Sequence, residues 1–280
     1  MPDNYSELAE TLRSRMSLDR PLPPDWGRSR SGVRPPEQTT NPPEGYHFIF
    51  CPRCNNKSFP VEVDQLGPDG HRVRHQECQT AWDEPPITNS KERVLSPFFA
   101  SKLKLYLNNL PGDVKAKNKS STQAIKTFLI REGVLSDSIG YARDIEPRQS
   151  NFRSGEFIWD VACLVPNAEY GGSDKPGRVN QDLIFVAESE NDVRRHEIFK
   201  DATKLPKARA DVRFMIFRAD DAEELKGVFD DLRKFFRGHK KTQVGDVYIM
   251  AGMDKETLAY DVGKLTVPRP GANWDGWEVF

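Results

Sequence analysis

DLIFVAESE, residues 182–190, is a run of apolar residues that ends in two glutamates. Its short length and its Ile, Phe and Val content predict a buried β-strand. Because side chains alternate along a strand, Glu188 and Glu190 are expected on one face at its C-terminal end. A second strand is predicted over residues 157–165, FIWDVACLV, and it carries Asp160 inside it, where an unpaired charge is costly. If the two strands are neighbours, three carboxylates converge.

Outward from this stretch, helices alternate with strands. Apolar periodicity predicts helices over residues 96–108, 122–132, 191–207 and 222–236, and strands over residues 212–217, 247–251 and 258–262. Residues 112–121 are rich in lysine and in helix breakers and are predicted to form a loop. The alternation predicts an α/β fold with a mixed central sheet flanked by helices.

Converging carboxylates repel one another unless a cation neutralises them. The hard divalent cations Mg²⁺ and Mn²⁺ prefer oxygen ligands and suit such a cluster. Acids at strand ends also cap loops or pair with arginines, and Arg194 and Arg195 follow closely. Asp160 within a strand and the order of the elements favour the metal.

This part of the chain resembles the PD-(D/E)XK nuclease superfamily, which has the restriction-endonuclease-like fold. The resemblance covers about residues 120–220: a helix, a strand with Asp160, a strand with Glu188-x-Glu190, a helix and a further strand. It implies that Asp160 and Glu188 hold Mg²⁺ or Mn²⁺, which activates a water for phosphodiester hydrolysis.

The superfamily motif usually ends in lysine, and this chain has Glu190 at that position. Some restriction enzymes of the superfamily are similar in carrying Glu-x-Glu. Glu190 is expected to orient the water, as a general base or through the metal. Lys200 and Lys204 are alternatives, but the apolar stripe of the predicted helix 191–207 places both nearer its opposite face. Lys204 is kept as a second candidate because helix ends bend, and Glu132 is a candidate fourth acid.

A cysteine and histidine unit precedes this region. Cys51 and Cys54 are separated by two residues, and His75 and Cys78 repeat that gap after twenty intervening residues. Two such loops can turn four ligands toward a tetrahedral Zn²⁺. His71 and His47 are rival ligands. The segment resembles a zinc ribbon, with residues 58–63 and 72–74 expected as its two strands.

We expect this zinc to be structural, since four protein ligands leave no open position and a unit of this size has little core of its own. A modest basic surface is expected from Arg53, Lys57, Arg72 and Arg74, and Trp82 is expected to offer an aromatic platform for nucleic acid. Cys163 is expected to be a small buried side chain.

Composition limits the remaining possibilities. Lys and Arg number 41 against 42 Asp and Glu, which excludes a generally polycationic nucleic-acid coat protein. No apolar run is long enough to span a membrane, and residues 1–20 lack the apolar core of a secretory signal, so a cytoplasmic protein is expected. Residues 1–44 are expected to form a short helix and a Pro/Arg-rich linker, residues 45–90 the zinc-ribbon-like module and residues 91–280 the nuclease-like domain.

The sequence therefore predicts a metal-dependent endonuclease that acts on nucleic acid, with DNA favoured, and with structural Zn²⁺ and catalytic Mg²⁺ or Mn²⁺. A restriction or defence enzyme would fit the layout, on the resemblance alone. The main alternative is a non-catalytic zinc-ribbon adaptor or nucleic-acid-binding protein with a degenerate nuclease fold. A third is a protein-interaction domain without metal. The sequence allows a homodimer and does not determine the oligomeric state.

Overall fold

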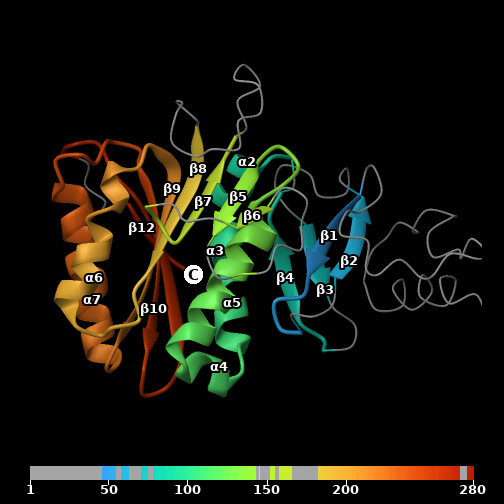
Figure 1. The fold of residues 1–280 in the computed structure, drawn as a ribbon, viewed down its shortest axis with the longest axis horizontal. Coiled ribbons are helices and arrows are strands. Elements are labelled where there is room, and N and C mark those ends of the chain that lie inside the picture. Colours follow the sequence, from blue (N-terminus) through green and yellow to red (C-terminus); the bar gives the residue numbers. More distant parts are fainter. Residues whose placement is uncertain are drawn as a thin grey trace, which may run out of the picture.

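The computed structural model describes residues 46–54, 58–62, 71–74, 78–86, 88–142, 145, 152–154, 158–165, 182–271 and 276–280. Its centre is an eight-stranded sheet with helices on both faces, and a smaller β-rich region lies beside it (Figure 1). The predicted α/β class with a mixed sheet flanked by helices is confirmed. No helix in this part of the chain combines the length and the apolar content needed to cross a membrane.

The central sheet is mixed. In spatial order its strands are β12 (Trp277–Val279), β11 (Tyr260–Thr266), β10 (Val247–Asp254), β9 (Ala210–Ala219), β8 (Leu183–Ser189), β7 (Val161–Leu164), β5 (Ile139–Ala142) and β6 (Phe152–Ser154). Strands β8, β9 and β10 run parallel to one another. Strands β5, β7 and β8 form an antiparallel meander. The carboxyl ends of the three parallel strands therefore share one end of the sheet.

Each face of the sheet carries its own helical layer (Figure 1). One layer consists of α2 (Ser90–Leu95), α3 (Pro97–Asn109), α4 (Gly112–Ala116) and α5 (Asn118–Gly133); the other consists of α6 (Arg195–Ala202), the 3₁₀ turn η3 (Leu205–Lys207) and α7 (Ala222–Gly238). The alternation of β9 serves both layers. Phe214 and Ile216 belong to the core under α3 and α5, whereas Met215 and Phe217 belong to the core under α6 and α7.

Helix α7 has an N-cap residue and the apolar stripe that its sequence predicts. Asp221 caps it by accepting a hydrogen bond from the Glu224 amide at 2.8 Å. Its apolar stripe is buried, and the stripe consists of Leu225, Val228, Phe229, Leu232 and Phe236. The predicted helix over residues 222–236 is confirmed, and it extends two residues further, to Gly238.

Three expected elements differ from the structure. Residues 112–121, predicted as a loop, contain α4 and the start of α5. Lys115 supports this turn, because its side chain is buried and its ammonium binds the carbonyl oxygens of Asn108 and Leu258. The helix predicted over residues 191–207 is shorter and ends at Ala202. The strand predicted over residues 157–165 is also shorter, and Asp160 lies directly before it rather than inside it.

The smaller region contains two hairpins. Strand β1 (Tyr46–Phe50) pairs with β2 (Ser58–Glu62), and β3 (His71–Arg74) pairs with β4 (Ala81–Glu84), both antiparallel. The expected pairing of residues 58–63 with 72–74 is wrong, because each of these strands pairs across the nearer cysteine-bearing turn. The cysteine-bearing segments thus connect β1 to β2 and β3 to β4, and a short connection is enough to join antiparallel strands.

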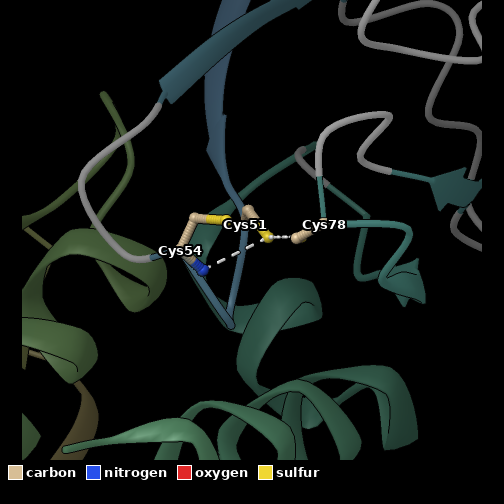
Figure 2. Close-up of side chains that lie close together, drawn as sticks. All are labelled: Cys51, Cys54 and Cys78. Atoms are coloured by element: carbon tan, nitrogen blue, oxygen red, sulfur yellow. Dashed lines mark hydrogen bonds between the residues drawn. The ribbon is translucent and has the colours of Figure 1, made fainter.

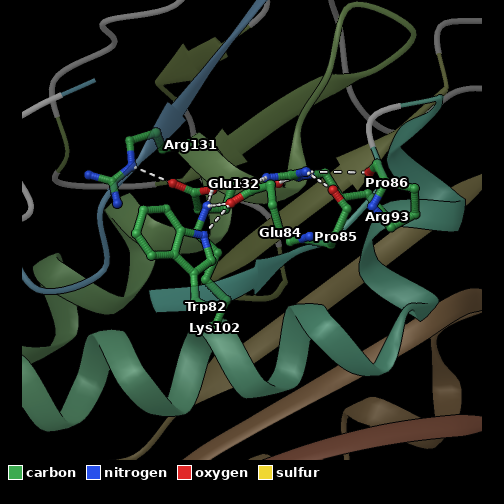
Figure 3. A network of polar contacts seen from close by, with 8 residues as sticks. All are labelled: Trp82, Glu84, Pro85, Pro86, Arg93, Lys102, Arg131 and Glu132. Carbon is green, nitrogen blue, oxygen red and sulfur yellow. Dashed lines mark hydrogen bonds and ion pairs between the residues drawn. The ribbon is translucent and has the colours of Figure 1, made fainter. Parts of the chain in front are cut away.

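A buried ionic network joins the smaller region to the helices (Figure 3). It consists of Glu84 from β4, Arg93 from α2, Lys102 from α3 and Glu132 from α5. Lys102 Nζ lies 2.6 Å from an oxygen of each glutamate, and Arg93 Nη2 lies 2.6 Å from Glu84 and 3.0 Å from Glu132. All four side chains are 0–1% exposed. Two acids and two bases thus neutralise each other out of contact with water.

Two expectations are corrected by this network. Glu132 is not a fourth acid of the carboxylate cluster, because both of its oxygens bind cationic side chains: Arg93 and Lys102 at one, Arg131 at the other. Trp82 is not an exposed stacking platform. It is 4% exposed, and its indole N–H donates to Glu84 Oε2 at 2.6 Å.

The elements predicted for the N-terminal segment lie outside the described residues. These are the helix over residues 5–16 and the Pro/Arg-rich linker up to residue 44. At the other end, Trp277 packs against the domain, with its ring 5.6 Å from that of Phe229.

Candidate functional site

Three cysteines gather between the two hairpins (Figure 2). Cys51 and Cys54 come from the turn between β1 and β2, and Cys78 comes from the turn before β4. Their sulfur atoms all lie within 4.8 Å of one another, with 3.6 Å between Cys51 Sγ and Cys78 Sγ. That separation is too long for a disulfide and close to the ~3.8 Å between two thiolates that share a tetrahedral zinc at about 2.3 Å. The cluster can bind a metal such as zinc.

The protonation of these thiols links metal binding to pH. Burial and the neighbouring cysteines raise the pKa of Cys54 to about 12, and burial also raises the pKa of Cys51. The thiols of Cys51 and Cys54 are therefore protonated at neutral pH without metal, and zinc must displace these two protons when it binds.

The fourth ligand predicted for this metal, His75, lies outside the described residues. His47 and His71 are in β1 and β3, where the backbone is described and the side chains are not. The cysteine cluster thus contains three of the four predicted ligands.

The second candidate site lies at the end of β7 and β8. Val161 pairs with Ala187 in the antiparallel register, so Asp160 lies opposite Glu188. Asp160 Oδ2 accepts a hydrogen bond from the Ser189 amide at 2.9 Å, which fixes its carboxylate against the neighbouring strand. Glu188 is 2% exposed. The two predicted metal ligands therefore face each other across one strand pair.

A lysine from each helical layer holds one of these carboxylates. Lys126 of α5 places Nζ 3.1 Å from Asp160 Oδ1. Lys204 places Nζ 3.1 Å from Glu188 Oε2 and 2.7 Å from Asp201 Oδ1. We call Asp160, Glu188, Lys126 and Lys204 the carboxylate site.

The helical-phase argument against Lys204 is wrong. Helix α6 ends at Ala202, and Lys204 lies in the turn before η3. Because the regular 3.6-residue phase stops at Ala202, the chain can direct Lys204 back toward β8. Lys200 instead pairs with Glu197 on the exposed surface of α6.

The described neighbours of Glu188 do not fully compensate the charge of its carboxylate. Burial raises its pKa to about 8, and this effect outweighs the hydrogen bond from Lys204, which lowers it. Its second oxygen, Oε1, is buried and has no hydrogen-bond partner. An orphaned carboxylate oxygen beside a second carboxylate is chemically suited to a hard divalent cation, so the residues fit the predicted Mg²⁺ or Mn²⁺.

Glu190 has other partners. Strand β8 ends at Ser189, and Glu190 Oε1 accepts a hydrogen bond from the Asp192 amide at 2.7 Å. Burial and Asp201 raise its pKa. Among the described residues, only the three cysteines form a group of three or more potential ligands within 4.8 Å. The expected convergence of Asp160, Glu188 and Glu190 into one tight cluster is therefore not seen.

Sequence reasoning missed Lys126 and Asp201. Lys126 is only 7% exposed, although a lysine beside the apolar stripe of a helix is usually solvated. Asp201 precedes Lys204 by three residues and pairs with it, a spacing that is common on exposed helices. Cys163 is fully buried, and burial raises its pKa to about 12, which confirms the expected small core side chain.

In comparisons with protein-family models, with curated proteins and with solved structures, no match to the chain was found. What the protein does is therefore inferred from its own residues and their geometry.

Proposed function

We propose that the protein is a metal-dependent nuclease that hydrolyses phosphodiester bonds, with DNA as the favoured substrate. The observation that carries this proposal is the placement of Asp160 opposite Glu188, with Glu188 Oε1 buried and without a partner. Two carboxylates and two lysines at one strand end suit the binding of a divalent cation and of a phosphate.

The order of the elements supports the proposal. Helix α5 is followed by the antiparallel strands β5, β7 and β8, then by α6 and by β9, which runs parallel to β8. The two acids lie at the start of β7 and at the end of β8. This order of elements agrees with the resemblance to the PD-(D/E)XK superfamily. We therefore propose that this domain has the restriction-endonuclease-like fold.

In this mechanism Asp160 and Glu188 hold Mg²⁺ or Mn²⁺. When bound, the ion supplies a water of lowered pKa and neutralises charge on the phosphoryl oxygens. The Ser189 amide and Lys126 hold Asp160 in position for this role. Lys204, whose ammonium contacts Glu188, would take the role of the motif lysine and orient the attacking water. Glu190 is the second candidate for that task.

The cysteine cluster has a structural role in this proposal. Cys51, Cys54 and Cys78, with His75 as the fourth ligand, would hold Zn²⁺ and fix the two hairpins together. The exposed Arg53 and Arg72 of this region would contact nucleic-acid phosphates, although Arg72 also pairs with Asp83.

A second candidate function is a non-catalytic zinc-ribbon protein that binds nucleic acid or acts as an adaptor. The observation that favours it is the pairing of each carboxylate with a lysine, together with Glu190 in the position of the motif lysine. In that case the lysines would serve only to neutralise a former metal site.

Cleavage of plasmid and of single-stranded DNA in Mg²⁺ or Mn²⁺ separates the two functions. We expect Asp160→Asn and Glu188→Gln each to lower the rate by about 10²–10⁴-fold. The exposed Glu278→Gln is a matched control that should cut like the wild type. Calorimetric titration with Mn²⁺ gives a second readout, since both site variants should lose binding.

Cleavage that survives both site variants would contradict the proposed site. A folded, zinc-loaded protein that neither cuts nor binds Mn²⁺ would favour the non-catalytic function. Lys204→Met completes the series: loss of cleavage with retained Mn²⁺ binding is expected if Lys204 orients the water.

A further inference from the structure

An open hollow of about 380 Å³ lies at the carboxyl ends of the parallel strands β8 and β9. Its lining includes Asn118, Glu190, Asn191, Asp192, Arg218 and Lys255. In sheets with parallel strands, ligands commonly bind outside the carboxyl ends. The hollow is next to the carboxylate site, because Glu190 follows Glu188 by two residues.

Arg218 is a buried cation for which the described residues provide no acidic partner. It continues the alternation of Phe214 and Ile216 on the α5 face of β9, and it is 5% exposed. Its guanidinium donates hydrogen bonds to Asn118 Oδ1 and to the carbonyl oxygen of Lys115. Its Nε is buried and has no hydrogen-bond partner.

The charge of Arg218 is not compensated by an anionic group among the described residues. No ion pair joins Arg218 to a carboxylate in the described part of the chain, and burial lowers its pKa. A buried charge that has lost its hydration is costly unless a counter-ion compensates it. Because the residue lines the hollow, an anion that enters there can supply that charge.

The start of α5 reinforces the preference for an anion. The helix has sixteen residues, no side chain caps its N-terminus and its first turn contains no acid. Its first amides and the positive end of its dipole are therefore suited to a negative group. Lys255 adds a second charge, because its exposed pair with Asp220, at 3.2 Å, is weak in water.

The two acids of the hollow are already engaged. The Asp192 carboxylate binds the Arg194 guanidinium, and Glu190 Oε1 binds the Asp192 amide. Their charges are thus partly compensated, which leaves the buried Arg218 and the exposed Lys255 as the cations that can bind an anion.

Helix α5 connects the hollow to the carboxylate site. Asn118 lines the hollow, Thr122 accepts a hydrogen bond from Asn191, and Lys126 holds Asp160. These residues recur every four positions and so lie on one side of the helix. The two ends of the row are separated by about 12 Å of helix rise. That length corresponds to three or four nucleotides along B-form DNA, at about 3.4 Å per nucleotide.

We propose that the hollow is a second phosphate site, formed by Arg218, Lys255 and the N-terminus of α5, which binds a backbone phosphate of the nucleic acid a few nucleotides from the phosphate at the carboxylate site. This proposal rests on the proposed nuclease function. It adds a contact that positions the strand without reading its bases.

The test measures binding of fluorescent duplex and single-stranded oligonucleotides to full-length, zinc-loaded protein, with Ca²⁺ in place of Mg²⁺. The variants are Lys255→Gln, Arg218→Gln and Arg218→Lys. The control is Lys234→Gln, which removes one charge from a side chain that is 78% exposed on α7, in the layer on the other face of the sheet. Thermal unfolding checks that each variant is folded, and Lys255→Gln changes a side chain too exposed to support the fold.

We expect Lys255→Gln and Arg218→Gln each to weaken binding about five- to eightfold at 0.1 M salt, and to lower the slope of log K against log[salt] by about 0.7–0.9. Arg218→Lys should keep part of the affinity, since it retains the charge without the planar fork. Affinities and slopes equal to those of the wild type and Lys234→Gln would overturn the second phosphate site and leave the nuclease proposal intact.

If the wild type binds no nucleic acid, the nuclease proposal fails, and inorganic phosphate becomes the probe. A rise in melting temperature with phosphate, present in the wild type and lost in Lys255→Gln, would retain the hollow as a phosphate site. No such rise would overturn it as well.

Discussion

The buried ionic network and the carboxylate site are each built from two acids and two bases, yet they differ in how completely the charges are paired. In the network all four side chains are 0–1% exposed, and every glutamate oxygen has a cationic partner, with Arg131 at the edge of the network pairing Glu132 Oε1. In the carboxylate site Asp160 is 31% exposed and Lys204 35% exposed. There, Glu188 Oε1 has no hydrogen-bond partner in the part of the chain that the structure describes.

This difference separates a structural cluster from a functional one. In a fully paired network no carboxylate oxygen is left to bind a ligand. This network holds β4 against α2, α3 and α5. An unsaturated cluster at the end of a strand keeps a place for one more group. The charge count alone does not distinguish the two, whereas pairing and burial do.

The largest effect is expected from breaking the saturated network. Glu132→Gln should lower the free energy of unfolding by about 3–5 kcal/mol, because it leaves Arg93 and Lys102 buried with too little negative charge. Urea unfolding measures the loss, with the exposed Glu278→Gln as the matched control. A loss below about 1 kcal/mol would show that water reaches these lysine and arginine groups.

Acid should remove the same stabilisation without a mutation. Although burial alone would raise the pKa of Glu132, Lys102, Arg131 and Arg93 outweigh it and lower the pKa to about 2. Since the folded-state pKa is lower than the unfolded one, the contribution is complete above about pH 4.5 and is lost as the pH falls toward about 2. The loss amounts to about 3 kcal/mol.

The measurement is urea unfolding of wild type and Glu132→Gln from pH 7 to pH 3. Zinc release affects both proteins, so the difference between them isolates the glutamate. The gap should narrow as the pH falls. A gap independent of pH would indicate that Glu132 is not ionised in the folded protein.

The cysteine cluster should contribute next. Cys78→Ser should remove bound zinc, measured by atomic emission, and should lower stability by about 2.7 kcal/mol at free zinc a hundred times the Kd. Cys163→Ala is the control, because Cys163 is buried in the sheet away from the cluster. Equal zinc content in wild type and Cys78→Ser would exclude Cys78 as a ligand.

The smallest effect is expected in the carboxylate site. Glu188→Gln, without added Mg²⁺ or Mn²⁺, should change the free energy of unfolding by less than about 1 kcal/mol at pH 7. The burial that raises the pKa of Glu188 to about 8 opposes its ion pair with Lys204, and Lys204 keeps Asp201 as a partner. A loss as large as that of Glu132→Gln would erase the distinction between the two clusters.

Much of the fold follows from local patterns. The strands β8 and β9 and the helix α7 have strong periodicity and were predicted within a few residues, because each has one dominant apolar pattern. Residues 112–121 form α4 and the start of α5 instead of the predicted loop, and the contact of Lys115 with Leu258 that supports them comes from a distant part of the chain. Local propensity does not contain such contacts.

The candidate sites divide in the same way. The spacing of Cys51, Cys54 and Cys78 and the positions of Asp160 and Glu188 are visible in the sequence, because the chemistry of these side chains is distinctive. Lys126 was not found, since nothing local distinguishes a lysine that is 8% exposed beside a carboxylate from a solvated one.

The sequence by itself determined the α/β class, the two neighbouring strands beside which Asp160 and Glu188 lie, and the three cysteines that can hold a metal. Only the tertiary structure decided which strands pair around those cysteines, that Glu132 and Trp82 are buried with Glu84, and that Lys204 turns back to Glu188. The physical reason is that the first group depends on periodicity and residue chemistry within a few positions. The second depends on which charges lose water together, and that is set by segments far apart in the chain.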